Sequence, residues 1–360
     1  MLTRLLEDIL RQPNALNGCL HHLGGTSKTL LERAATLLVD APRVHVVGIG
    51  SSWNAGLAVN SALQRAGLSS CLFDASELLH FGPFPKDTTV LVLSRSGRSV
   101  EIVRLIDKVR SSNSAIIAIT NTPDSPLALA ADVCIDLKAT FDHLVSVVMY
   151  SGLVLAGSLI AARIRAELSE QLIDVLALVL ERTDGYLSAW REQIDHCGWL
   201  KSDAPTYFLA RGPSLASAHQ ARLLWEEAAK MPASSLSTGG FRHGSQEMVW
   251  PGSRAAMWID PSRQRDEDLR LAADLHSAGA LVLLIGQQLP ASNGNVVINL
   301  PVIPEGWQCL VDIIPAQLAA ERLARLRGVD CGAFRLCQYI VEQEGGLGIP
   351  SSNNRSIEGS

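Results

Sequence analysis

Residues 94–99 (Ser-Arg-Ser-Gly-Arg-Ser) have the residue types of an anion site. They follow four apolar residues, 90–93, which predict a buried strand, and they lead into a stretch with apolar residues at helical spacing. Hydroxyls and backbone N–H groups at a helix N-terminus bind phosphate, because the helix dipole favours negative charge. We therefore predict that Ser94, Ser96 and Ser99 hold the phosphate of a small metabolite and that Arg95 adds charge. The alternative is an ordinary serine-rich turn with a helix cap.

A second small-residue turn, Gly50-Ser51-Ser52, follows the predicted strand 43–47. The segment 48–50 begins like a dinucleotide fingerprint, but Trp53 stands where the third glycine should be, and its ring would block close helix–strand packing. The sequence also lacks a G-x-x-x-x-G-K-[ST] motif. We therefore expect no nucleotide cofactor and no metal. The alternative for this turn is an ordinary strand–helix connection.

A carboxylate and an imidazole form the third group of candidates. Glu226 and Glu227 lie on a predicted helix, and His243 follows the turn 238–240. These two side-chain types are well suited to proton transfer at neutral pH. The alternative is a solvated helix face and a surface histidine.

The elements that must position these residues alternate between strands and helices. Predicted strands cover 43–47, 71–73, 90–93, 115–119 and 133–137 in the first half, and 207–210, 255–259, 281–285 and 296–300 in the second. This alternation predicts parallel sheets with helical crossovers, and the repeated pattern predicts two similar domains. Ligands of such sheets sit at the carboxyl ends of strands, where both small-residue turns would lie.

Helical spacing marks residues 2–11 and 26–38, and we expect Gln12-Pro13 to end the first of these helices. The uncharged stretch 144–162 has the length of a membrane span, but its serines and glycines favour a buried core helix. A polar helical stretch, 168–190, is predicted to connect the two halves.

Composition excludes several classes of protein. The 360 residues carry a net charge of −5 with no strong Lys/Arg run, so a nucleic-acid partner is not expected. Seven cysteines are scattered without a C-x-x-C pair, which indicates reduced thiols in a cytoplasmic protein. The first fifteen residues include several charges and lack the apolar core of a signal peptide.

Taken together, these residues resemble the sugar isomerase (SIS) domain family, in particular the isomerase half of glucosamine-6-phosphate synthase, related phosphosugar isomerases and fructosamine-6-phosphate deglycases. The likeness begins at the segment 12–15 (Q-P-N-A) and spans nearly the whole chain. It implies an α/β fold of two tandem, doubly wound, flavodoxin-like SIS domains, each with three α/β/α layers. The expected divisions are a helical segment 1–40, a first SIS domain 41–165, a connector 166–200, a second SIS domain 201–330 and a tail 331–360.

The resemblance also implies roles for individual residues. Gly50-Ser51-Ser52 matches the family's G-T/S-S loop, residues 93–99 match its L-S-Q-S-G-E-T with Arg95 in place of the glutamine, and Ser146 matches a sugar-contacting serine. Glu227 matches the glutamate that moves a proton between C1 and C2, and His243 matches the histidine that opens the sugar ring. In the family this histidine can come from the neighbouring subunit, which implies a homodimer.

Three departures narrow the implied activity. No cysteine-led glutaminase segment precedes this region, so we expect that the chain does not by itself draw ammonia from glutamine. Leu224 replaces a family lysine, and the C-terminal lysine that forms a Schiff base in the synthase falls near Cys337 or Gln338. Of the six lysines, Lys138 and Lys230 are the candidates to substitute for it.

The resemblance thus implies a phosphosugar isomerase that acts on an (amino)hexose 6-phosphate. A fructosamine-6-phosphate deglycase is the alternative within the enzymes, because its substrate already carries the nitrogen. A sugar-phosphate sensor without turnover is the alternative from another class. The tail 345–360 is rich in Gly, Ser and Asn, and we expect it to be flexible unless it closes over the site.

Overall fold

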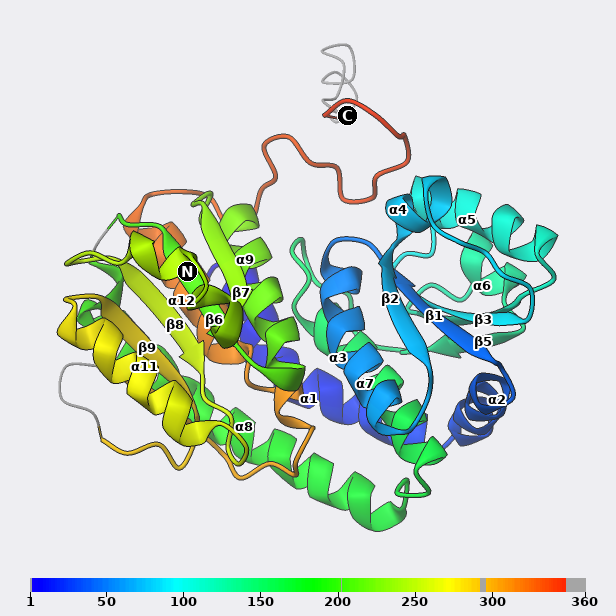
Figure 1. Cartoon of the computed structure of the whole chain (residues 1–360), viewed down its shortest axis with the longest axis horizontal. Coiled ribbons are helices and arrows are strands. Elements are labelled where there is room, and N and C mark those ends of the chain that lie inside the picture. Colours follow the sequence, from blue (N-terminus) through cyan, green and yellow to red (C-terminus); the bar gives the residue numbers. More distant parts are fainter. Residues whose placement is uncertain (1, 202, 292–295, 348–360) are drawn as a thin grey trace.

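The computed structural model describes residues 2–201, 203–291 and 296–347. Its first sheet has five parallel strands in the order β2-β1-β3-β4-β5 (Figure 1). The strands are β1 (Arg43–Gly48), β2 (Ser70–Asp74), β3 (Thr88–Leu93), β4 (Ala115–Thr120) and β5 (Val133–Asp136). The chain runs outward to β2 on one side of β1 and to β3 on the other. The strand order therefore reverses between β1 and β3, which is where doubly wound sheets bind ligands.

The second sheet repeats this order as β10-β9-β8-β6-β7, again with parallel strands. The strands are β6 (Thr206–Ala210), β7 (Ala233–Ser237), β8 (Arg254–Trp258), β9 (Leu281–Gln287) and β10 (Val296–Leu300). Its reversal point lies between β6 and β8. The predicted fold of two tandem doubly wound α/β domains is confirmed. Strand β7 was not predicted, because its sequence (Ala-Ser-Ser-Leu-Ser) has a single large apolar residue.

Helices cover both faces of the first sheet. Residues of α2 (Lys28–Val39), α3 (Ser51–Arg65) and α7 (Val148–Ile164) share a core with one face, which includes Val46 and Leu91. Residues of α4 (Ala75–His80), α5 (Val100–Ser111) and α6 (Pro126–Ala130) form a separate core with the other face, which includes Val47 and Val92. The alternation of neighbouring strand residues between the two cores gives the predicted three layers.

The second sheet is covered in the same way. Helices α8 (Glu170–His196), α9 (Leu215–Glu227) and α12 (Ile314–Leu326) share the core of one face, and α10 (Thr238–Phe241) and α11 (Arg265–Ser277) pack on the other. The core containing α9 and α12 is continuous with the core of α3 and α7. The two domains therefore meet through a common apolar interior.

The uncharged stretch forms the buried helix α7, as predicted. Fifteen of its seventeen residues are buried, which explains why its apolar residues are not confined to one stripe. Among the described residues, no helix is long and apolar enough to span a membrane.

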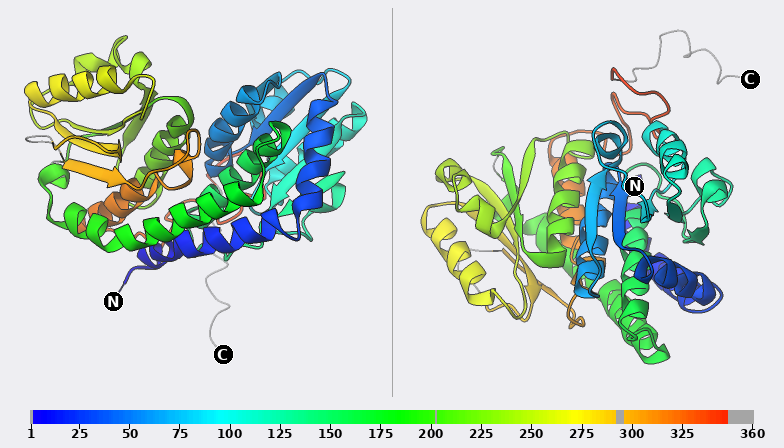
Figure 2. Two further views of the ribbon diagram at one scale, coloured as in Figure 1. Left: turned by 90° about the horizontal axis from the view of Figure 1, so that it is seen from below. Right: turned by 45° about the vertical axis from the view of Figure 1, so that its right-hand side comes forward.

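Helix α1 (Arg4–Gly24) shows that the predicted break at Gln12-Pro13 is wrong, because the helix continues through Pro13. Both residues are buried, and the Gln12 amide donates to Ser151 Oγ of α7 at 2.8 Å. Packing against α7 and α8 outweighs the local cost of a proline inside the helix. Figure 2 shows α1 and α8 side by side along one edge of both domains, so they join the two halves.

Candidate active site

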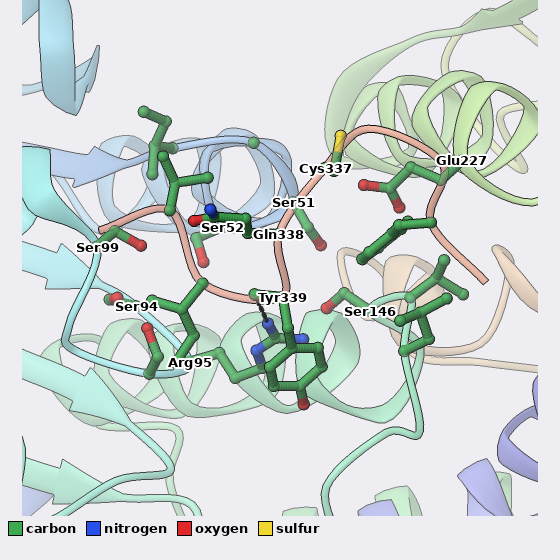
Figure 3. Close-up of a pocket in the computed structure, with 18 of the residues that line it drawn as sticks. Ser51, Ser52, Ser94, Arg95, Ser99, Ser146, Glu227, Cys337, Gln338 and Tyr339 are labelled. Carbon is green, nitrogen blue, oxygen red and sulfur yellow. Dashed lines mark hydrogen bonds between the residues drawn. The ribbon is translucent and has the colours of Figure 1, made fainter. Parts of the chain in front are cut away.

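A cavity of about 240 Å³ lies at the carboxyl ends of β1 and β3, at the reversal point of the first sheet. Every residue predicted to bind substrate lines it: Gly50, Ser51, Ser52, Ser94, Arg95, Ser96, Ser99 and Ser146. Glu227 lines the same cavity from the second domain, and Figure 3 shows its carboxylate on the side opposite Ser94 and Ser99. The fold thus brings residues from four separate parts of the chain to one place.

The serine loop after β3 is held by a hydrogen bond within the loop and by two from the end of β4. Ser94 Oγ accepts from the Gly97 N–H at 3.1 Å, and the Arg95 carbonyl accepts from the Thr120 and Thr122 hydroxyls, each at 3.1 Å. Gly97 has a φ of 58°, and a Cβ at this position would lie 2.2 Å from Ser125 Oγ. Both observations require glycine here, so the loop shape is determined by the sequence.

The turn after β1 leaves a hydroxyl ready for a ligand. Gly50 has a φ of 57°, which lets helix α3 begin directly after the strand. Ser51 Oγ is buried, and the residues that the structure describes offer it no hydrogen-bond partner. A buried hydroxyl without a partner is costly, so its place on the cavity wall fits a polar ligand. Trp53 instead packs edge-on against His219 of the second domain, with ring centroids 5.6 Å apart.

Glu227 has the properties of a proton-transfer group. It lies at the C-terminal end of α9, where burial raises the pKa of its carboxyl from 4.5 to about 7, against the opposing effect of Arg95 and Lys230. Its neighbour Glu226 lies on another face of the helix and pairs with Arg222 at 2.6 Å. Of the two adjacent glutamates, Glu227 is therefore the one placed for chemistry.

Gln220, a buried residue of α9, connects the helix that carries Glu227 to two other segments that line the cavity. Gln220 Oε1 accepts from the Asn54 amide of α3 at 3.0 Å, and its amide donates to the Ser146 carbonyl at 3.0 Å. Gln220 is fully buried. These bonds hold α9, the turn after β1 and the segment before α7 in one arrangement.

The Ser146 segment is fixed by Asp142. Both carboxylate oxygens of Asp142 accept from the backbone N–H groups of residues 147–149, at 2.9 to 3.0 Å, and so cap the start of α7. Burial raises the pKa of Asp142 to about 6, while these three bonds act in the opposite direction. Ser146 is thereby held at the cavity by the N-terminus of a buried helix.

The C-terminal segment 334–341 forms a further wall that sequence reasoning did not place. Figure 3 shows Cys337, Gln338 and Tyr339 crossing the cavity, and the Arg95 guanidinium stacks on the Tyr339 ring at 4.1 Å. Arg95 also donates to the Tyr339 carbonyl at 2.9 Å, and the Val100 N–H donates to the Val341 carbonyl at 3.0 Å. Beyond these residues, Glu344 pairs with His80 and Arg104. Residues 345–347 are exposed, and the rest of the predicted flexible tail lies outside the described residues.

His243 does not line this cavity. It is exposed in the turn between α10 and η3 (Ser245–Met248), and its N–H donates to the Gly240 carbonyl at 3.0 Å. The structure therefore brings Glu227 to the serine loops within one chain but does not bring His243 there.

Neither candidate lysine reaches the cavity. Lys138 is exposed, with a φ of 49°, and Lys230 donates to the carbonyls of Glu227 and Ala333. Among the described residues that line the cavity, none is a lysine.

Glu101 is a cavity residue that sequence reasoning missed, and its Oε2 is buried without a partner in the described part of the chain. Its position in the first turn of α5, just after the serine loop, was the available signal.

Comparisons with known proteins agree with this geometry. Residues 37–165 match the SIS domain family. Glutamine–fructose-6-phosphate aminotransferases from Pyrobaculum aerophilum and Aeropyrum pernix are 24% and 28% identical to this chain, and each match covers 91% of the chain and 55% of the relative. The chain thus spans about half the length of these relatives.

Solved structures show the same fold at low identity. The C-terminal domain of glucosamine-fructose-6-phosphate aminotransferase from Francisella tularensis has a TM-score of 0.81 at 20% identity, covering 92% of this chain and 97% of that one. Glucosamine-6-phosphate deaminase from Thermotoga maritima (TM-score 0.76, 20% identity) covers 94% of this chain and 99% of its own. Tagatose-6-phosphate ketose/aldose isomerase from Escherichia coli has a TM-score of 0.76 at 19% identity, and the match covers 92% of this chain and 94% of that one. Residues 37–165 of this chain thus match the SIS domain family, and the chain shares the fold of these solved structures.

Proposed function

We propose that this protein is a phosphosugar isomerase that moves a proton between C1 and C2 of an (amino)hexose 6-phosphate. The observation that carries the proposal is the position of Glu227, which lines the same cavity as the serine loops and has a pKa raised to about 7. A pure binding module has no need of such a carboxyl, which is why an enzyme is preferred over a sensor.

The two sides of the cavity have different roles: the serine loops bind the substrate, and Glu227 on the opposite side transfers the proton. The sugar phosphate is held by Ser94, Ser96 and Ser99 at the start of α5, where the helix dipole favours the anion. Ser52 and Ser146 contact the phosphate and the sugar from the other loops. The open-chain sugar then extends toward Glu227, which removes a proton from one carbon and returns it to the next, through an enediol, while a hydroxyl proton moves from the oxygen on one of these carbons to the oxygen on the other.

Glu227 can serve both steps because of its pKa. A group that is about half ionised near pH 7 can accept the proton as a carboxylate and donate it as the acid.

Glu227→Gln should abolish the wash-in of deuterium from solvent at C1 or C2 of the bound sugar, a loss of about a hundredfold or more. The matched control is Glu226→Gln, next in sequence but paired with Arg222, which should retain exchange. Unchanged exchange in Glu227→Gln would refute the assignment.

Opening of the sugar ring is assigned to His243 of a second subunit, so the proposed enzyme is a homodimer. The support is that His243 is exposed and outside the cavity of its own chain. Glu227→Gln and His243→Asn should each be inactive on the ring form. Mixing them should restore part of the activity, because one site of a mixed dimer then has both native groups. Failure of the mixture to recover activity, with mixed dimers demonstrated by mass, would contradict this arrangement.

A fructosamine-6-phosphate deglycase is the second candidate, and one observation favours it. Cys337 and Gln338 line the cavity where the synthase family would place its Schiff-base lysine, and no described lining residue has an amine side chain. A substrate that already carries nitrogen needs no such lysine. Incubation with fructosamine 6-phosphates distinguishes the two: release of free amine identifies the deglycase, whereas aldose–ketose interconversion without amine identifies the isomerase.

A further inference from the structure

The reversal point of the second sheet is occupied by a carboxylate of the chain itself. Asp312 lies just after η4 (Gln308–Leu310) and is 1% exposed. Its Oδ2 accepts from Ser214 Oγ at 2.7 Å, and its Oδ1 accepts from Ser217 Oγ at 2.5 Å. Both serines belong to the segment that follows β6, the strand next to the reversal point.

The turn after β6 resembles the turn after β1 in the first domain. Gly50 and Gly212 have nearly the same left-handed φ, 57° and 55°, and each is followed two residues later by a serine, Ser52 or Ser214. Each turn leads from the first strand of its domain into a helix, α3 or α9. The two turns therefore share a left-handed glycine and a serine at the same sequence spacing from it.

The two reversal points differ in the space that remains. The cavity of the first domain measures about 240 Å³, whereas only about 10 Å³ is left beside Ser214 and Asp312. A space of that size is at the lower limit for one water molecule. The Asp312 side chain lines this remaining space together with Ser214.

We propose that the second sheet has an oxyanion site that Asp312 fills from within, and that removing its carboxylate opens the site to small carboxylates such as formate. The comparison with the first domain rests on the proposed function, because it takes the first site to hold a phosphate. The occupation of the second site by Asp312 does not depend on that assumption.

The bonds to Asp312 also anchor the helix that carries Glu227. Ser214 and Ser217 lie at the beginning of α9, and Glu227 is its last residue. The Trp258 indole donates to the Asp312 backbone carbonyl at 2.9 Å, which ties the same point to β8. Asp312 is thus a positioning residue, and an anion that replaces its carboxylate should restore this anchor.

The experiment is a thermal unfolding series on Asp312→Ala at pH 8 in sodium formate and in sodium chloride at equal ionic strength. We expect a Tm below that of the wild type in chloride, and a rise of several degrees in formate that grows with the formate concentration. The wild type should have the same Tm in both salts. A bound anion stabilises the folded state by RT ln(1 + [L]/Kd), so the Tm of the variant should rise with the logarithm of the formate concentration once this exceeds Kd. Equal Tm values for Asp312→Ala in both salts, or an equal formate effect on the wild type, would overturn the proposal.

Two further variants guard the result. Ser214→Ala combined with Asp312→Ala should lose the response to formate, because a hydroxyl that would hold the anion is gone. Asp312→Asn keeps the side-chain volume and should show no response, so a response there would place the formate effect elsewhere and count against the site. If Asp312→Ala does not fold in chloride, recovery of folded protein in formate alone supports the proposal, and failure in both salts contradicts it.

The outcomes separate this proposal from the proposed function. Absence of sugar-phosphate binding or turnover by the wild type would refute the function and leave the formate test unaffected. Absence of formate rescue would refute the internal anion and leave the Glu227 exchange assay unaffected.

Discussion

The protonation of Glu227 determines how the proposed reaction should depend on pH. Burial raises the pKa of this carboxyl from 4.5 to about 7, and the ionised form is the one that removes a proton from the sugar. With a pKa near 7, about a tenth of the enzyme is ionised at pH 6 and about nine tenths at pH 8. The turnover number should therefore rise by about tenfold between these two values.

Arg95 provides the perturbation that tests the cause. Its positive charge is the largest of the nearby charges that lower the pKa of Glu227, acting against burial. Arg95→Gln removes that charge, so the pKa of Glu227 should rise further. The rise of the turnover number with pH should then occur at higher pH. Arg98→Gln is the matched control: it lies three residues away on the same loop, pairs with Asp124 and does not line the cavity. Its pH profile should remain that of the wild type.

The assay is the deuterium exchange of a hexose 6-phosphate, measured from pH 5.5 to 9 at saturating substrate. Saturation matters because the substrate phosphate itself titrates near pH 6, and the turnover number reports the groups of the enzyme–substrate complex. Two results would refute the reasoning. One is a wild-type turnover number that does not change between pH 5.5 and 9, as a midpoint close to 4.5 would give, which would mean that burial does not affect Glu227. The other is a pH profile with the same midpoint in Arg95→Gln, the wild type and Arg98→Gln.

Two further predictions concern the scaffold of the cavity. Gly97→Ala should abolish sugar-phosphate binding in calorimetry and destabilise the fold by about 2 kcal/mol or more, because its φ is 58° and the new Cβ would collide with Ser125. Gly67→Ala has a φ of 86° in open space and should keep binding. Gln220→Ala breaks two buried hydrogen bonds and should lower the free energy of unfolding in urea by about 2–5 kcal/mol, with a loss of turnover. A Gln220→Ala variant as stable and active as the wild type would contradict its role as the link between the walls.

Much of the fold could be predicted because its signals are local. Most strands of both sheets are short apolar runs, and the small-residue turns that follow several of them predict where the carboxyl ends lie. Local sequence signals fail to predict an element where tertiary packing determines whether it forms. Pro13 stays inside α1 because its neighbours are buried against two other helices, and β7 forms from small residues because β6 supplies its hydrogen-bonding partner.

The candidate site could be predicted only in part for the same reason. Glycine and serine types mark the loops that follow β1 and β3, and their placement at one cavity follows from the topology. The wall formed by the C-terminal segment depends on contacts such as that of Arg95 with Tyr339, which are 244 residues apart in sequence. Nothing in the local pattern of either residue predicts that pairing. The exposed position of His243 likewise depends on the tertiary fold rather than on its neighbours in sequence.

The burial of α7 has a consequence for dissecting the protein into fragments. The side chains that cover this helix come from α2 and α3 of its own domain, from α1, and from η4 of the second domain. A fragment limited to residues 37–165 would lack α1 and η4, and the apolar surface thus exposed would drive aggregation. The boundaries of the family match therefore do not mark an autonomous folding unit, and a soluble minimal fragment must retain α1 together with the second domain.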